Sequence, residues 1–450
     1  MMQHDYTHKR FLVIDDQPTA RDSLRTIAQS IGAFSVEFSV NYQDALYRIR
    51  QNTPDIILCD YMLGDSRSGQ QLLEELRRFN LLPDECIFMM VTGEQSYEQV
   101  VSAVELVPDD YIIKPFSPDK LLLRLDRIMA RKQFFGPYYK EKRTAAHDRA
   151  LATLSRLAQR EEARNYRFEV LRQKAECELA AGNATAAEGT YRAILENFDF
   201  PWARAGVARS LHRQKRLTEA RQEIERVVAG TPNFFDAADL KASICLDQGE
   251  PEEAQRVLDA VAKRTPRNYL RKRLLAEAAL LNGDSSTANA VLADVLANDT
   301  MPGAVQPADR LALARSQADA NDLINAERTL LGMREMELQH LPLDEQVSFA
   351  ALLALTSPER GKARFNGLRP AFGTPGLSTI ARIDVLRTAL SLADHALADA
   401  QSALLLEGED AKRSFNRMRA LYALQGREMD FRNIQKTVAL RRIHHDAPVT

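Results

Sequence analysis

Residues 55–60 (DIILCD) form a short, continuous apolar run that stops abruptly at a carboxylate, Asp60. Three other apolar runs end in the same way at a polar side chain: residues 11–14 before Asp15 and Asp16, residues 86–91 before Thr92, and residues 111–113 before Lys114. An alternating stretch at residues 35–40 predicts a fifth strand, and amphipathic segments with helical spacing separate the strands. Continuous apolar strands alternating with helices predict an α/β domain, a doubly wound, five-stranded parallel sheet covered by five helices.

The composition is that of a globular protein with more than one domain. The chain has 450 residues, 45% of them apolar and 27% charged, with a formal net charge of −2. This balance favours neither nucleic acid nor a membrane surface as a partner. Four scattered cysteines predict buried, reduced thiols. We find no signal peptide and no apolar run that could span a membrane, so we expect a cytoplasmic protein.

The polar residues that end the strands predict a phosphoryl-transfer site. Parallel strands of a doubly wound sheet all finish at one edge, so three carboxylates, a hydroxyl and an ammonium should meet there. Clustered carboxylates repel one another and are suited to bind Mg²⁺. One carboxylate can then attack phosphorus, while the cations neutralise the oxygens of the transferred group.

Four runs of sequence resemble the response-regulator receiver family, whose fold is flavodoxin-like. They are residues 12–16 (LVIDD), 55–63 (DIILCDYML), 91–93 (VTG) and 109–116 (DDYIIKPF). The resemblance implies that Asp60 accepts a phosphoryl group from a histidine kinase or phosphotransfer protein. It also implies that Asp15, Asp16 and Asp60, with the backbone carbonyl of Met62, bind Mg²⁺.

The same resemblance assigns roles to the ends of the last two strands. Thr92 binds a phosphoryl oxygen and Lys114 pairs with it, so both act with Asp60. Tyr111 is the aromatic switch that follows Thr92, although an ordinary half-buried strand tyrosine is the alternative. The Lys114–Pro115 bond is expected to be cis.

Three features depart from the common family pattern. The loop after Asp60 has one additional residue before Gly69, Gly64 replaces a proline, and Val107–Pro108 replaces a Gly-Ala pair. These changes affect the loop beside the site and the end of the fourth helix, whereas every reacting side chain is retained.

The chain from residue 166 to about residue 300 carries a helical repeat of 33 or 34 residues. Two sets of alanines keep one register over four units: Ala175, Ala208, Ala242 and Ala276, and then Ala187, Ala220, Ala254 and Ala288. Gly182, Lys215, Gly249 and Gly283 lie five residues before the second set. This pattern resembles the tetratricopeptide repeat, in which small residues let helices pack closely and a permissive residue forms the turn. An irregular helical bundle is the alternative.

We therefore expect three segments: a receiver domain at 1–133, a helical linker at 134–165, and an all-α tetratricopeptide-like solenoid at 166–450. Gly136–Pro137 should end or kink the helix that precedes the linker. A plain linker and a dimerising coiled coil are alternatives, so the sequence leaves a homodimer open. Ala314 and Ala326 could mark a fifth unit, and Gly361 and Gly373 are expected in loops.

No enzyme signature accompanies the repeats, and we expect no classified enzymatic activity. The main hypothesis is a response regulator whose phosphorylation controls the binding of a protein or peptide in the groove of the repeats. One alternative is a phosphate sink or kinase-docking competitor without a separate output. The other is a cryptic enzyme in the helical region.

Overall fold

A computed structural model describes residues 4–64, 68–78, 80–93, 108–265, 268–297, 305–333, 338–408 and 410–445. The chain divides into two compact units, residues 1–237 and 238–450, and each is considered by itself.

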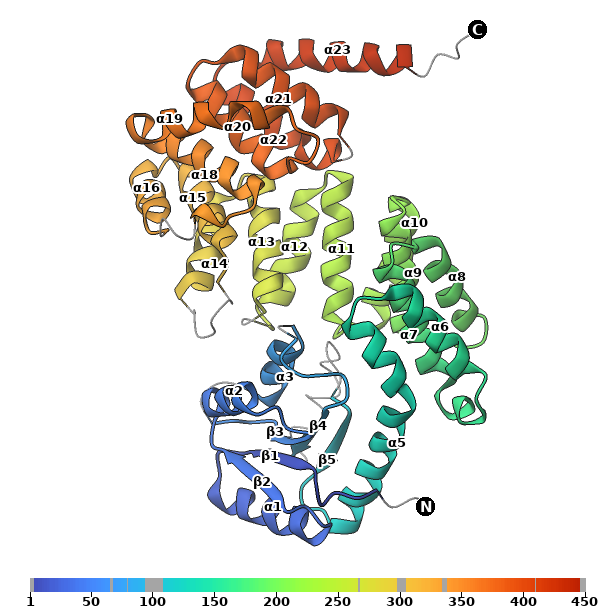
Figure 1. Cartoon of the computed structure of the whole chain (residues 1–450). Helices are drawn as coiled ribbons and strands as arrows, with labels where there is room; N and C mark the ends of the chain where they lie inside the picture. The colour runs from blue at the N-terminus through green and yellow to red at the C-terminus, as the bar shows by residue number, and fades with distance from the viewer. Residues whose placement is uncertain are drawn as a thin grey trace. The chain divides into compact units, whose positions relative to one another are not determined.

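A five-stranded parallel sheet opens the first unit (Figure 1). Its strands are β1 (Arg10–Ile14), β2 (Ser35–Ser39), β3 (Ile56–Asp60), β4 (Ile87–Thr92) and β5 (Asp110–Ile113). Their spatial order is β2-β1-β3-β4-β5, and every neighbouring pair is parallel. The predicted sheet is confirmed, because the four apolar runs and the alternating stretch all form paired strands.

Helices cover both faces of this sheet. The helices α1 (Pro18–Ser30) and α5 (Pro118–Arg143) share a core with alternate strand residues such as Val13 and Leu58. The helices α2 (Tyr42–Gln51) and α3 (Gly69–Arg78) lie on the other face (Figure 1). The fourth of the five expected helices would fall within residues 94–107, outside the described residues.

Gly136–Pro137 were predicted to end or kink this helix, and they do not end it, because α5 continues through both residues to Arg143. Proline inside a helix removes one hydrogen bond and costs about 3 kcal/mol. Four aromatic side chains around this proline are buried in a core that α6, η1 and α7 complete: Phe134, Phe135, Tyr138 and Tyr139. Burying one large apolar side chain contributes about 1.5–3 kcal/mol, so the cluster outweighs the lost hydrogen bond.

After α5 the described residues are helical and contain no strand. In chain order the elements are α6 (His147–Ala158), η1 (Glu161–Tyr166), α7 (Arg167–Ala180), α8 (Ala184–Leu195), α9 (Pro201–Arg213), α10 (Leu217–Gly230), α11 (Phe235–Gln248), α12 (Pro251–Ala262), α13 (Tyr269–Asn282), α14 (Ser285–Ala297), α15 (Pro307–Asp319), α16 (Leu323–Leu331), α18 (Leu343–Thr356), α19 (Pro358–Gly367), η2 (Arg369–Gly373), α20 (Thr379–Ser391), α21 (His395–Glu407), α22 (Ala411–Leu424) and α23 (Glu428–His445). The predicted all-helical region is confirmed.

The first four helical hairpins keep the spacing that the sequence predicted. The helices α7, α9, α11 and α13 begin 34 residues apart, at positions 167, 201, 235 and 269. One or two residues after each of these helices lies a residue with positive φ: Gly182 at 82°, Lys215 at 60°, Gly249 at 84° and Gly283 at 80°. Asn321, after α15, and Ala393, after α20, repeat this conformation at 61° and 57°. A left-handed residue at each helix end lets the next backbone amide bond back to the finished helix.

Both alanine ladders lie in the core. All eight alanines are between 0% and 2% exposed, as close helix packing requires. Gly361 was expected in a loop but lies inside α19, where an added Cβ would come 2.2 Å from the Ala354 backbone nitrogen. The absence of a side chain there allows α19 to approach α18.

All four cysteines are free and buried, as predicted. In the part of the chain that the structure describes, no helix is both long and apolar enough to cross a membrane.

Two glycines within helices test the packing of the first hairpins. A Cβ at Gly206 of α9 would lie 2.5 Å from the ring of Tyr191, which is 2% exposed, whereas nothing lies within 4 Å of a Cβ at Gly189 of α8. Gly206→Ala should lower the free energy of unfolding by about 1–3 kcal/mol through overpacking. Gly189→Ala should raise it by up to about 1 kcal/mol through helix propensity. Denaturant titration measures both, and an equal effect of the two changes would contradict the packing.

Candidate functional site

The side chains that end β1, β3 and β5 meet at one edge of the sheet. Lys114 Nζ lies 2.7 Å from Asp15 Oδ2 and 2.7 Å from Asp60 Oδ1. These three residues are far apart in sequence and are brought together because parallel strands finish at the same edge. The geometry gathers an ammonium and two carboxylates into one cluster, which are three of the five groups that the sequence predicted to meet at this edge.

Neighbouring residues hold the Asp60 carboxylate in place while it stays partly exposed to solvent. Its side chain is 14% exposed, and its Oδ2 accepts a hydrogen bond of 2.9 Å from the Met62 backbone amide. Gly69 packs closely against the backbone of Asp60. An added Cβ at Gly69 would lie 2.3 Å from the Asp60 carbonyl oxygen and 2.7 Å from Cys59 Sγ. The carboxylate is therefore fixed by its neighbours while one face stays open to a reagent.

The two acidic residues after β1 differ in burial. The Asp15 side chain is 1% exposed, and its Oδ1 accepts a 2.9 Å hydrogen bond from the Gln17 amide. Asp16 is exposed, and its Oδ2 would lie 2.8 Å from a Cβ at Gly64. Gly64 has a φ of 73°, which proline cannot adopt, so the glycine in place of the usual proline suits the shape of this loop.

The remaining predicted residues occupy the neighbouring strands. Thr92, at the end of β4, is fully buried, and its hydroxyl donates to the Gly93 carbonyl at 3.1 Å. Tyr111 is half-buried in β5 and pairs in register with Met90. The Lys114–Pro115 bond is cis, as predicted. Val107, one of the family departures, lies outside the described residues.

Burial and charge together set the electrostatics of the site. Burial raises the pKa of the Asp60 carboxyl above its ordinary value, although the hydrogen bond from Lys114 acts in the opposite direction. Burial acts to lower the pKa of Lys114, but its hydrogen bonds to Asp15 and Asp60 outweigh burial and the pKa is raised. Burial also raises the pKa of the Cys59 thiol well above its ordinary value, which keeps it a neutral core residue.

The predicted metal ligands are only partly assembled. Asp15 and Asp60 converge on Lys114, whereas Asp16 lies beside Gly64. Across the described ranges, no three acidic, histidine or cysteine side chains are close enough together to hold one ion. The donor set still fits Mg²⁺, because two carboxylates already converge, a third follows directly in sequence, and all are hard oxygen ligands.

Sequence reasoning missed the charged anchor of α5. Lys132 is 5% exposed, and its Nζ lies 2.8 Å from Asp109 Oδ1 and 2.7 Å from the Asp84 carbonyl oxygen. Arg131 also pairs with Asp109, at 2.6 Å. Further along α5, Lys142 lies 3.1 Å from Asp84. The only signal in the sequence was the pair of acidic residues before β4, Asp84 and Glu85. The cation could not be predicted, because a helix with many cations does not reveal which one is buried.

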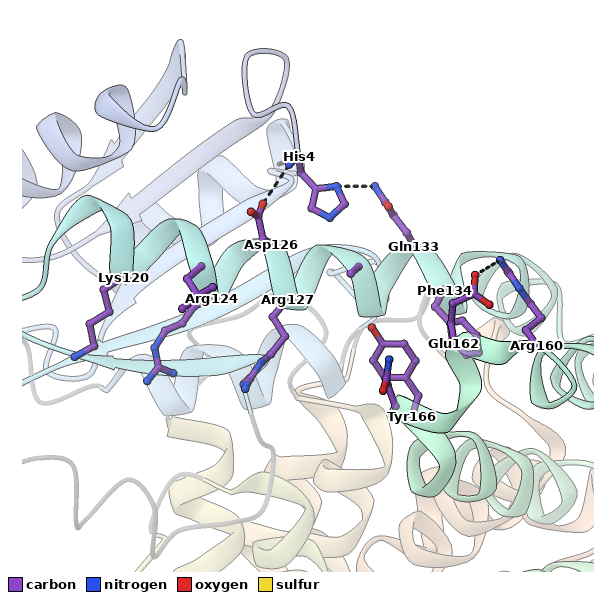
Figure 2. A pocket seen from close by; sticks show the side chains of 13 residues that line it. His4, Lys120, Arg124, Asp126, Arg127, Gln133, Phe134, Arg160, Glu162 and Tyr166 are labelled. Carbon is purple, nitrogen blue, oxygen red and sulfur yellow. Dashed lines mark hydrogen bonds and ion pairs between the residues drawn. The ribbon is translucent and has the colours of Figure 1, made fainter. Parts of the chain in front are cut away.

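A separate cavity of about 860 Å³ lies along the outer side of α5 (Figure 2). His4 donates its backbone amide to Asp126, and Arg160 pairs with Glu162 at 3.1 Å. None of the predicted site residues lines this cavity, so it is distinct from the cluster around Asp60.

Comparison with known proteins identifies the first part of the chain. Residues 11–126 match the family of response regulator receiver domains. The phosphate regulon transcriptional regulatory protein PhoB of Escherichia coli (strain K12) is 33% identical over 123 residues, which are 27% of this chain and 52% of that protein. PhoB of Pseudomonas aeruginosa is 34% identical over 123 residues, which again are 27% of this chain and 52% of that protein. The chain thus spans about half the length of these curated relatives.

A solved structure gives a similar match. The crystal structure of the receiver domain of NtrX from Brucella abortus is 30% identical, covers 27% of this chain and 98% of that chain, and has a TM-score of 0.25.

The tight contact behind Asp60 predicts a selective effect of substitution. Gly69→Ala forces a methyl group against the Asp60 carbonyl oxygen and should lower the free energy of unfolding by about 1–3 kcal/mol. Gly93→Ala is the control, because no atom of the described residues lies within 4 Å of its added Cβ. Thermal and denaturant unfolding of the two variants measure the difference, and a Gly69→Ala variant as stable as the control would refute the contact.

Proposed function

We propose that this chain, whose residues 11–126 form the receiver domain of a two-component response regulator, is switched by phosphorylation at Asp60. The observation that carries the proposal is the position of Lys114 Nζ, 2.7 Å from a partly exposed Asp60 carboxylate. An Asp60 oxygen would attack the phosphorus of a phosphohistidine, on a histidine kinase or a phosphotransfer protein. The phosphorus–nitrogen bond breaks, and the donor histidine retains the electron pair.

Mg²⁺ is the cofactor that this chemistry requires. Asp15, Asp16 and Asp60, with the carbonyl of Met62, would hold it, and the ion would supply positive charge to the oxygens of the transferred group. Lys114 supplies a second positive charge from the protein itself. It already pairs with both Asp15 and Asp60, so it is positioned where negative charge accumulates.

Thr92 and Tyr111 are the proposed route by which the new charge is sensed. The Thr92 hydroxyl now donates to a backbone carbonyl beside the site and would turn to the phosphoryl oxygen instead. Tyr111 lies on the adjacent strand and is half-buried, and its ring would turn inward when Thr92 moves. The receiver would then occupy two states whose populations depend on phosphorylation.

Helix α5 connects this receiver to the helical region. It has 26 residues, about 39 Å of continuous helix, and begins four residues after Lys114. Its far end is buried in the aromatic core that η1 and α7 share. A shift of α5 at the sheet edge would therefore reach α7 through packed side chains.

The helical region is proposed to be a tetratricopeptide-like repeat array that binds a protein partner. Support comes from the 34-residue spacing of four hairpins, the two buried alanine ladders, and the left-handed turns between helices. Repeat arrays of this kind present extended surfaces for peptides. A binding role explains the region without any catalytic group.

Phosphorylation is tested by mass spectrometry of the intact chain after incubation with Mg²⁺ and acetyl phosphate. Wild type should gain one phosphoryl group, and Asp60→Asn should gain none because its nucleophilic oxygen is lost. Asp22→Asn, on the exposed side of α1, is the matched control and should react like wild type. Modification of Asp60→Asn to the wild-type extent would refute the assignment, and chelation of Mg²⁺ should abolish the reaction.

Control of partner binding is tested by affinity capture from cell extract. The wild-type chain, with and without beryllofluoride as a phosphoryl mimic, should retain different amounts of its partner, because the mimic shifts the receiver between states. Asp60→Asn should retain the same amount in both conditions. Identical capture by wild type in both conditions would instead favour a phosphate sink.

A further inference from the structure

A contact between distant hairpins closes the helical array of the second unit. In a linear stack of repeats, each hairpin contacts only its neighbours. Helix α22 nevertheless reaches helices that lie far before it in the chain (Figure 1). Arg413 pairs with Asp247, near the end of α11, at 2.8 Å, and with Glu277 of α13 at 2.5 Å, across 166 and 136 positions of sequence. The stacking of neighbouring hairpins does not account for this contact.

A second arginine of α22 makes the same kind of contact one turn later. Arg417 forms an ion pair with Asp319, the last residue of α15, and Arg387 of α20 pairs with the same carboxylate. The side chains of Arg417 and Asp319 are only 11% and 8% exposed. Because residues four positions apart lie on one face of a helix, α22 presents one charged face to α11, α13 and α15.

Gly249 lets the start of α22 come close to the turn after α11. An added Cβ at Gly249 would lie 2.9 Å from the Lys412 carbonyl oxygen. Gly283, at the corresponding place after α13, has a φ of 80°, close to the 84° of Gly249. No atom of the described residues lies within 4 Å of a Cβ at Gly283. The two glycines therefore share a turn conformation, but they differ in their contact with α22.

Other residues of α22 are buried in the core of the C-terminal helices. Met418, Leu421 and Tyr422 belong to an apolar cluster with residues of α18, α20, α21 and α23. Among the described residues, that cluster includes none from α11, α13 or α15. Apolar packing therefore holds α22 to the C-terminal helices, whereas ion pairs hold it to the earlier ones.

The helices that α22 joins surround the inner surface of the array. A cavity of about 380 Å³ is lined mainly by α13, α15, α18 and α20, each the first helix of its hairpin, and by Arg417 of α22. Curved repeat arrays bind peptides along such extended surfaces. Arg417 thus lies at the surface that a peptide partner would use.

We propose that α22 is a latch: the ion pairs of Arg413 and Arg417 close the array of the second unit over its inner surface, and the array opens when these pairs break. Ion pairs suit a reversible closure, because the cost of desolvating the charges offsets much of their attraction. A peptide partner would enter the open form, so the regulatory part of this inference rests on the binding role proposed above.

Opening is measured in the full chain by double electron–electron resonance between two spin labels. The labels are attached at Glu252→Cys, at the start of α12, and at Asn416→Cys, in α22, because both positions are exposed. The four natural cysteines are buried, so the labels react with the introduced thiols.

Arg413→Glu should open the array, because it places a third acid beside Asp247 and Glu277. The population at a longer distance between the labels should rise at least about tenfold over wild type, since breaking a buried pair is strongly unfavourable to the closed form. Arg419→Glu is the matched control, because Arg419 is an exposed arginine of the same helix, and it should keep the wild-type distances.

Two further sets of variants separate opening from unfolding. Arg413→Glu combined with Asp247→Arg and Glu277→Arg restores opposite charges and should return the wild-type distances. Gly249→Ala, which pushes against the start of α22, should also populate the longer distance, whereas Gly283→Ala carries the same turn strain without that contact and should not. Wild-type distances in Arg413→Glu, or an equal effect of the two glycine substitutions, would overturn the latch.

The result is separable from the proposed function, because the distance measurement requires neither a partner nor phosphorylation. If Arg413→Glu opens the array and no partner is captured in any state, the latch stands and the binding role fails. If phosphorylation alters partner capture and Arg413→Glu leaves the distances unchanged, the latch fails and the switch stands.

Discussion

The site of the first domain depends on the pairing of Lys114 with Asp15 and Asp60. Two carboxylates this close to each other repel, and the ammonium that pairs with both offsets part of that cost. A parallel sheet makes the arrangement possible, because β1, β3 and β5 deliver these side chains to one edge from positions distant in sequence. The same edge leaves Asp60 partly exposed and so able to react. Stability and reactivity therefore depend on the same three charges.

The sequence was sufficient for the sheet and for the meeting of Asp15, Asp60 and Lys114 at its edge. Apolar runs such as residues 56–59 are buried on both faces, so their pattern is continuous and is easily recognised. The end of each run marked the polar residue at the sheet edge. Asp16 shows where this reasoning stops, because a spacing of one residue does not determine whether a side chain joins the cluster or turns to solvent.

In the helical region, too, a repeated pattern could be predicted from the sequence, whereas a contact between distant elements could not. The two sets of alanines that contain Ala187 and Ala208 could be predicted from the sequence, because small residues repeat at a fixed period. Both of these alanines are fully buried. The continuation of α5 through Pro137 was not readable, because a local rule for proline was overridden by an aromatic cluster assembled from four elements. Lys215 adopts a turn conformation usually left to glycine, and only its position in the repeat indicated this.

Charge is used differently in the two units, and this difference bears on function. Around Asp60, one cation serves two acids and leaves a reactive oxygen at the surface. In the second unit, arginines pair with acidic residues of other helices, as Arg273 and Asp309 do between α13 and α15, and Asp319 pairs with both Arg387 and Arg417. Hydrogen-bonded ion pairs of this kind help to fix the register of the packed helices. Glu345 has no hydrogen-bond partner for its Oε2 among the described residues, and it lies in the first turn of α18, where the positive end of the helix dipole favours an acid.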